Sequence, residues 1–230
     1  IIVLDSKHKV GKKVSKIYDN YKDKIIEIGL TPNRCDAISH FGVARDLRAA
    51  LSYRNEKQIE LIAPSTSSFT NTIISPNLSI DIVDSKDCQR FSGVIINNIT
   101  VGESPSFIKN KLMALGLKPI NNIVDITNYV MHEIGQPLHA YDRNKISSNT
   151  IKIQKLKKGT KFITLDGIER ELGGNDLMIC DDNTPMCLAG VFGGNFHGVS
   201  ENTTSIFLES AFFNPVSVRK SAKYHSLKTD

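Results

Sequence analysis

In the first third of the chain, the spacing of apolar residues predicts one strand and one helix. Residues 25–30 form a short apolar run that ends at a Thr-Pro-Asn turn signal, which predicts a strand. A helix is predicted next, with Asp36 as its N-cap, because apolar residues then recur every three or four positions as far as Leu51. Residues 63–77 are rich in Ser, Thr, Asn and Pro, so we expect a linker or a long surface loop there.

Two more helices are predicted in the middle of the chain. Ser104 and Pro105 supply an N-cap and a proline for the first turn of a helix that stops at Gly116. A second helix is expected to begin at a cap on Asp125 and to close at Gly135.

Strand patterns occupy most of the second half. Strands are predicted at residues 79–83, 91–99, 151–156, 162–165, 177–180, 186–192 and 206–213. Asp166 and Gly167 form the pair that a two-residue hairpin turn prefers, and Asn214 caps a last helix that ends near Tyr224. Because helices and strands mix without regular β-α-β alternation, we predict an α+β fold with mixed and antiparallel sheets.

Composition narrows the class of protein. With 230 residues, 40% of them hydrophobic and 23% charged, the chain is typical of a globular protein with one large domain or two small ones. No apolar run approaches the roughly 20 residues that span a bilayer, so we expect no membrane association. The four cysteines form no Cys-x-x-Cys pair, which argues against a disulfide framework and against a zinc site. Their pattern fits the reducing cytoplasm.

The net charge of +5 is concentrated at the two ends of the chain. Residues 1–24 hold seven lysines against three aspartates, and residues 216–230 hold four basic residues against one aspartate. Two basic ends on one fold could form a patch that attracts a polyanion such as RNA, but solvated surface lysines explain the same pattern. The lack of Trp and of interleaved aromatic residues gives no support for a single-strand binder.

The usual local signatures of catalysis are absent, including the Walker loop, Gly-x-Ser-x-Gly and His-Glu-x-x-His. His139 lies in a loop that begins at Gln136-Pro137. It could position or deprotonate a water, or it could be a structural histidine bonded to a backbone carbonyl. Glycines at 190, 193 and 194 either end a strand in a tight turn or let the backbone approach a ligand.

Glu209 is the most unusual residue of the pattern. Strand alternation places it in one row with Phe207, Ala211 and Phe213, and the opposite row is apolar too. Burying an unpaired carboxylate costs several kcal/mol or forces it to take up a proton. Glu209 should therefore pair with a lysine or arginine, or face a pocket that takes a polar ligand group, and the pattern leaves both open.

Three strings of residues resemble the beta subunit of bacterial phenylalanine–tRNA ligase. The first contains GLTPNRCD and GVARDL within residues 29–47, the second NNIVDITNYV and GQPLHA within 121–140, and the third GVFGG, ESAFF and RKSA within 190–222. The resemblance implies that residues 1–230 are the editing-domain region, excised from a longer chain and built of two interleaved subdomains. We expect an N-terminal segment at about 1–62, a linker at 63–77 and a mainly β subdomain at 78–230; a free-standing homologue is the alternative.

The resemblance also implies a function. A ligase for phenylalanine must reject tyrosine, and an apolar pocket discriminates against an added hydroxyl by only about a hundredfold. A second site that hydrolyses mischarged tyrosyl-tRNA with a positioned water is therefore expected. His139 would orient the water or the ribose hydroxyl, and Glu209 would bind the phenol. Family positions for substrate binding also fall on Asn128, Gly193, Thr229 and Lys118, where Lys118 replaces a common arginine and loses its planar fork.

The expected partners follow from the same resemblance. They are tRNA(Phe) and the synthetase alpha subunit, in an α2β2 heterotetramer in the cytoplasm. ATP and Mg²⁺ are expected in the full enzyme and no cofactor in this region. The competing interpretation is a structural scaffold that docks tRNA and has an inactive editing pocket, and an unrelated peptide-binding module is a third.

Overall fold

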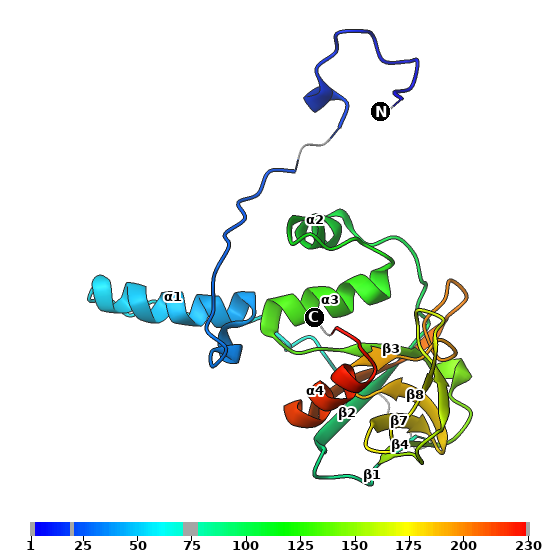
Figure 1. Cartoon of the computed structure of the whole chain (residues 1–230). Helices are drawn as coiled ribbons and strands as arrows, with labels where there is room; N and C mark the ends of the chain where they lie inside the picture. Colours follow the sequence, from blue (N-terminus) through cyan, green and yellow to red (C-terminus); the bar gives the residue numbers. More distant parts are fainter. Residues whose placement is uncertain (1–2, 19–20, 71–77, 229–230) are drawn as a thin grey trace.

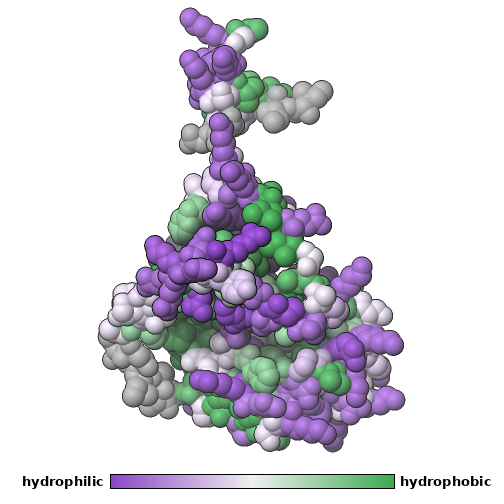
Figure 2. All heavy atoms as spheres, turned by 90° about the vertical axis from the view of Figure 1, so that its left-hand side faces the viewer, coloured by the Kyte–Doolittle hydropathy of each residue, from purple (hydrophilic) through white to green (hydrophobic). Residues whose placement is uncertain are grey.

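The computed structural model describes residues 3–18, 21–70 and 78–228, which form an N-terminal arm and a wide body (Figure 1). The arm contains the short 3-10 helix η1 (Val14–Lys16) and otherwise runs as irregular chain, seen as a narrow stalk in Figure 2. The strand predicted at residues 25–30 is wrong, since Ile25 and Ile26 are 72% and 78% exposed and no described strand pairs with them. An apolar run becomes a strand only where a neighbouring backbone completes its hydrogen bonds.

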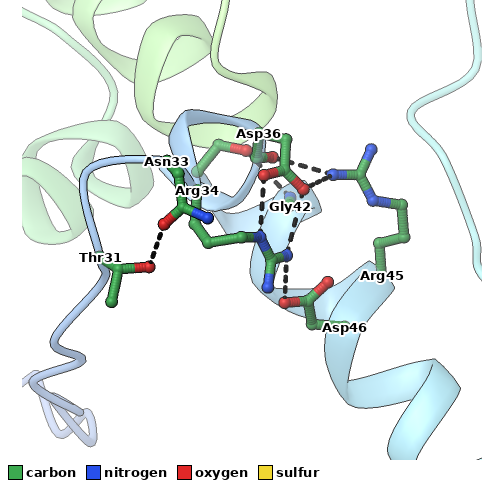
Figure 3. Close-up of polar contacts among 8 residues, drawn as sticks. Thr31, Asn33, Arg34, Asp36, Gly42, Arg45 and Asp46 are labelled. Carbon is green, nitrogen blue, oxygen red and sulfur yellow. Dashed lines mark hydrogen bonds and ion pairs between the residues drawn. The ribbon is translucent and has the colours of Figure 1, made fainter.

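The arm joins the body through η2 (Cys35–Ala37) and the helix α1 (His40–Arg54). Ser39 caps α1 by accepting a 2.9 Å hydrogen bond from the Gly42 N–H, so the predicted cap at Asp36 is wrong. The Asp36 carboxylate instead pairs with Arg34 at 3.0 Å and with Arg45 at 2.6 Å (Figure 3). A charged side chain with two guanidinium partners nearby gains more from them than from the free N–H groups of a helix end.

The same cluster of ion pairs fixes the corner between η2 and α1. Arg34 also reaches Asp46 of α1 at 2.5 Å, so it connects η2 to the helix (Figure 3). A Cβ atom on Gly42 would lie 2.4 Å from the Asp36 carbonyl oxygen, so the two segments approach this closely only because residue 42 is glycine. The first string of the resemblance therefore has a structural role at this corner.

The next two helices meet at a buried carboxylate. Ser104 does not cap α2 (Ser106–Ala114) as predicted; its hydroxyl donates to the Asp125 carboxylate at 2.5 Å. Asp125 also accepts from the Ile120 N–H at 2.8 Å and is only 1% exposed, so it cannot serve as the cap of α3 (Asn122–Ile134). Asn121 is the cap of α3, and the helix closes at Gly135 in the left-handed conformation, as predicted.

Three sheets form the body. The antiparallel three-stranded sheet has the order β2 (Cys88–Asn97), β10 (Ser205–Phe213) and β3 (His139–Asp142), with β10 in the centre. The five-stranded sheet has the order β1 (Ser79–Ile82), β4 (Thr150–Lys155), β7 (Leu177–Asp181), β8 (Thr184–Leu188) and β9 (Phe192–Gly193). Only its β1–β4 pairing is parallel. The strands β5 (Lys161–Ile163) and β6 (Glu169–Glu171) form a hairpin.

These sheets and helices confirm the α+β prediction. The two larger sheets take their strands from interleaved parts of the chain, and η3 (Arg143–Lys145) follows β3. The predicted strand at 186–192 is wrong as one element, because a turn at Gly190 with a φ of +68° divides it into β8 and β9. Gly167 lies in the β5–β6 turn with a φ of +77°, but the two-residue turn predicted at Asp166 and Gly167 is wrong, because the Thr164 N–H donates to the Ile168 carbonyl and leaves a three-residue loop. The Asn214 cap of α4 (Pro215–Tyr224) is as predicted.

The main core lies between the two larger sheets. It packs Phe91, Tyr141 and Phe207 of the three-stranded sheet against Ile151 and Ile179 of the other. On the outside, α3 contacts β3 and α2 contacts α3 (Figure 1). Within the described residues no helix is long and apolar enough to span a bilayer.

Candidate functional site

A cavity of about 1020 Å³ lies where the face of the three-stranded sheet meets α3 and α4. The α3 helix contributes Asn128 and Met131, which lie on one face at a spacing of three. The last part of β10 and one face of α4 supply further walls, together with the turn between β8 and β9. The cavity therefore draws on α3, on the turn between β8 and β9, and on the consecutive elements β10 and α4.

Four of the six predicted site residues line this cavity: Asn128, His139, Gly193 and Glu209. Lys118 does not; it is exposed in the loop between α2 and α3. Thr229 lies outside the residues that the structure describes. The resemblance therefore selected residues that the fold brings together, with Lys118 as the exception.

Strand pairing explains why Glu209 and His139 meet. They are direct partners across the antiparallel β10–β3 ladder, so their side chains lie on the same face, with Cβ atoms about 5 Å apart. Two residues along, Tyr141 and Phe207 are partners on that same face and are buried in the core. The face that forms the core thus continues into the cavity wall at Glu209.

The Glu209 carboxylate is buried in this wall and is 6% exposed. Its Oε2 accepts a 2.6 Å hydrogen bond from the Tyr141 hydroxyl. Burial raises the pKa of Glu209 to about 7, and the Tyr141 hydrogen bond opposes that rise. Among the described residues no lysine or arginine pairs with it, which favours the pocket-facing alternative over an internal ion pair.

His139 is a partly buried neutral imidazole at neutral pH. Burial lowers its pKa to about 4, because an imidazolium would lose its hydration there. Its ring stands edge-on to that of Tyr141, with centroids 4.5 Å apart. In the described part of the chain no backbone carbonyl accepts a hydrogen bond from the His139 ring. The alternative of a structural histidine bonded to a backbone carbonyl is therefore not supported.

Gly193 makes room for His139. A Cβ atom at this position would lie 2.8 Å from His139 Cε1 and 2.9 Å from Leu165 Cδ1. Both distances are shorter than real contacts, so any side chain would displace the imidazole or the leucine. Glycine is therefore needed here for the position of His139.

The cationic side chains that line the cavity all come from α4 and the residues that follow it. Arg219, Lys223 and Lys228 are exposed and line the cavity, whereas Glu209 is the one acidic residue among its described lining residues. The other basic stretch lies on the arm, away from α4 (Figure 1), so the two basic ends do not form a single patch, which agrees with the alternative of solvated surface lysines. No group of three metal-ligating side chains occurs among the described residues.

Sequence reasoning missed Tyr141 and the place of the α4 cations. Tyr141 is two residues after His139, so alternation along a strand would have put both on the same face. Arg219 and Lys223 were noted only as charge, although their spacing of four places them on one helix face. The sequence pattern predicts which face of a strand or helix a side chain occupies, but it does not predict which other element packs against that face.

Comparison with known proteins shows the family of this chain. Residues 87–230 match the B3/4 domain family. The whole chain is 52% identical to part of the phenylalanine–tRNA ligase beta subunit of Porphyromonas gingivalis and 44% identical to part of that of Aquifex aeolicus, and it covers 28% of each.

A solved structure gives a looser match. It is an N-terminal fragment of the phenylalanyl-tRNA synthetase beta subunit from Pyrococcus horikoshii, with 16% identity, 84% of this chain and 57% of that chain covered, and a TM-score of 0.43. That TM-score is too low to establish a shared fold.

Proposed function

This chain belongs to the B3/4 domain family, and we propose that it is a region of a phenylalanine–tRNA ligase beta subunit whose cavity hydrolyses tyrosyl-tRNA formed by mistake. Tyrosine differs from phenylalanine by one hydroxyl, which an apolar synthetic site rejects by only about a hundredfold. A second site improves on this if it recognises the hydroxyl itself. The cavity offers such recognition.

One observation carries the proposal: a buried carboxylate in the cavity wall beside a neutral imidazole. Glu209 accepts one hydrogen bond from Tyr141, and a carboxylate can accept several. A phenol that donates to Glu209 would satisfy it, whereas the ring of phenylalanine would leave the desolvated carboxylate short of a donor. Such unpaired buried groups give strong discrimination.

The chemistry requires little beyond orientation. A water oxygen attacks the ester carbonyl carbon, the bond to the ribose oxygen breaks, and the water proton passes to that oxygen. His139, with a pKa of about 4, is a weak base, so its main contribution is to orient the water by accepting a hydrogen bond. The aminoacyl ester is already reactive, and positioning supplies much of the remaining acceleration.

Other residues contribute to binding in this scheme. Asn128 on α3 can hydrogen-bond the amino acid or the ribose, and Gly193 holds the space for His139. Arg219, Lys223 and Lys228 would attract the phosphates at the 3′ end of the tRNA. For Lys118, we propose a contact with tRNA outside the cavity, in keeping with its exposed loop.

The remaining parts of the scheme concern the complete enzyme. The chain spans 28% of the length of its relatives, and we place the use of ATP and Mg²⁺ in the part beyond it. The partners that we propose are tRNA(Phe) and the alpha subunit in an α2β2 assembly in the cytoplasm.

The test is the variant Glu209→Ala in the complete ligase. Deacylation of tyrosyl-tRNA should fall roughly 10- to 100-fold, the value of a hydrogen bond to a charged group, while charging with phenylalanine stays unchanged. Glu201→Ala, which removes an exposed carboxylate that does not line the cavity, is the matched control. Equal loss of both activities would refute the assignment, and a wild-type enzyme without deacylation would favour the scaffold interpretation.

A further inference from the structure

We propose that Tyr141 is a positioning residue, which holds Glu209 so that one carboxylate oxygen faces the cavity to receive the phenol of the substrate. This inference rests on the proposed function and assigns a specificity role to a residue outside the cavity lining. It concerns the tyrosine hydroxyl alone, since the ring also belongs to the core.

The geometry of the contact carries the inference. The Tyr141 hydroxyl donates to Oε2 of Glu209 at 2.6 Å, the distance of a strong hydrogen bond to a charged acceptor. Tyr141 is 0% exposed, and its ring packs against His139 and Phe207, with centroids 4.5 and 6.1 Å away. A donor without rotational freedom fixes the acceptor, so Oε2 is held toward the core.

The second oxygen then has a defined place. Glu209 lines the cavity although one of its oxygens is engaged by a buried residue. With Oε2 bonded, Oε1 is the atom left for a ligand, and its orientation is set before the ligand arrives. Preorganisation of this kind lowers the entropy cost of binding, because the carboxylate is already ordered. It also places the ester within reach of His139.

Tyr141 also favours the ionised form of Glu209, because its hydrogen bond lowers the pKa that burial raises. The other groups around Glu209 contribute no charge at neutral pH: His139 on β3 is neutral, and burial raises the pKa of Cys88 on β2 to about 11 and that of Cys187 on β8 further. The remaining charged lining residues are Arg219, Lys223 and Lys228, all exposed.

The experiment compares Tyr141→Phe with the matched control Tyr129→Phe in the complete ligase. Tyr129 also donates its hydroxyl to a carboxylate, that of Glu133 at 3.3 Å, but it does not line this cavity. Deacylation of tyrosyl-tRNA is measured from pH 5.5 to 9, with kcat and KM separated, alongside charging with phenylalanine. Melting temperatures check that each variant folds.

For Tyr141→Phe we expect kcat/KM for tyrosyl-tRNA to fall roughly 10- to 100-fold at pH 7. In the wild type we expect the rising limb of the pH profile near pH 7, and in Tyr141→Phe it should move to higher pH, because Glu209 loses a donor that stabilises its charge. Tyr129→Phe should leave both the rate and the profile at wild-type values.

The outcomes separate this inference from the proposed function. An unchanged rate in Tyr141→Phe overturns it, and so does a lower rate with an unmoved pH limb, since a purely structural loss would not alter titration. Glu209→Ala, which removes the acceptor oxygens, is measured in parallel. If Glu209→Ala loses clearance and Tyr141→Phe does not, only the role of Tyr141 fails; if Glu209→Ala retains clearance, the proposed function fails and this inference with it.

Discussion

The free energy of unfolding of the chain should depend on pH through Glu209 and His139, which are partners across the β10–β3 ladder and have opposite effects on that dependence. Burial raises the pKa of Glu209 from 4.5 to about 7 and lowers that of His139 from 6.5 to about 4. Each difference corresponds to up to about 3 kcal/mol, at about 1.4 kcal/mol per pH unit. Replacing one of the two residues should therefore reveal how the other changes the free energy of unfolding with pH.

The signs follow from proton binding. Between pH 4.5 and 7 the folded chain keeps a proton on Glu209 that the unfolded chain has lost, so this contribution is complete below pH 4.5 and disappears as the pH rises through 7. Between pH 6.5 and 4 the unfolded chain binds a proton on its histidine that the folded chain does not, so stability falls as the pH drops through this range. In the wild type the two slopes largely cancel between pH 4.5 and 6.5.

The assay is urea denaturation of wild type, Glu209→Gln and His139→Gln from pH 4 to 8.5. Relative to wild type, Glu209→Gln should gain up to about 3 kcal/mol between pH 4.5 and 8, and His139→Gln should gain a similar amount as the pH falls from 6.5 to 4. Other carboxylates titrate in all variants and cancel in the differences. A Glu209→Gln difference that does not vary with pH would refute the buried, proton-binding carboxylate.

The remaining predictions concern the cavity and its opening. Gly193→Ala should destabilise the chain by about 1–3 kcal/mol and slow tyrosyl-tRNA deacylation, because its Cβ would lie 2.8 Å from His139, whereas Gly102→Ala, with nothing within 4 Å, should do neither. Replacing Arg219 and Lys223 with Gln should raise KM for tyrosyl-tRNA with kcat nearly unchanged, and should reduce the slope of log affinity against log salt by about 0.7 per lost phosphate contact. An unchanged salt slope would count against these cations as the tRNA contact.

Local signals were reliable where the chain makes its own partners. Gly135 ends α3 because a residue with positive φ is needed there, and Asn214 caps α4 with its own side chain. Asp36 and Asp125 are equally good caps by composition, but each is engaged by another segment, Asp36 by Arg45 and Asp125 by Ser104. Competition between local and distant partners is decided only when the segments meet.

The candidate site divides in the same way. Alternation alone placed Glu209 in an apolar row, and the resemblance named His139 and Gly193, which the fold brings into one cavity. The pairing of β3 with β10 decided the rest, since it brings Tyr141 to Glu209 from 68 residues away. Periodicity specifies which face a side chain occupies, because that depends on its own backbone; what the face meets depends on strand order, which is a property of the whole fold.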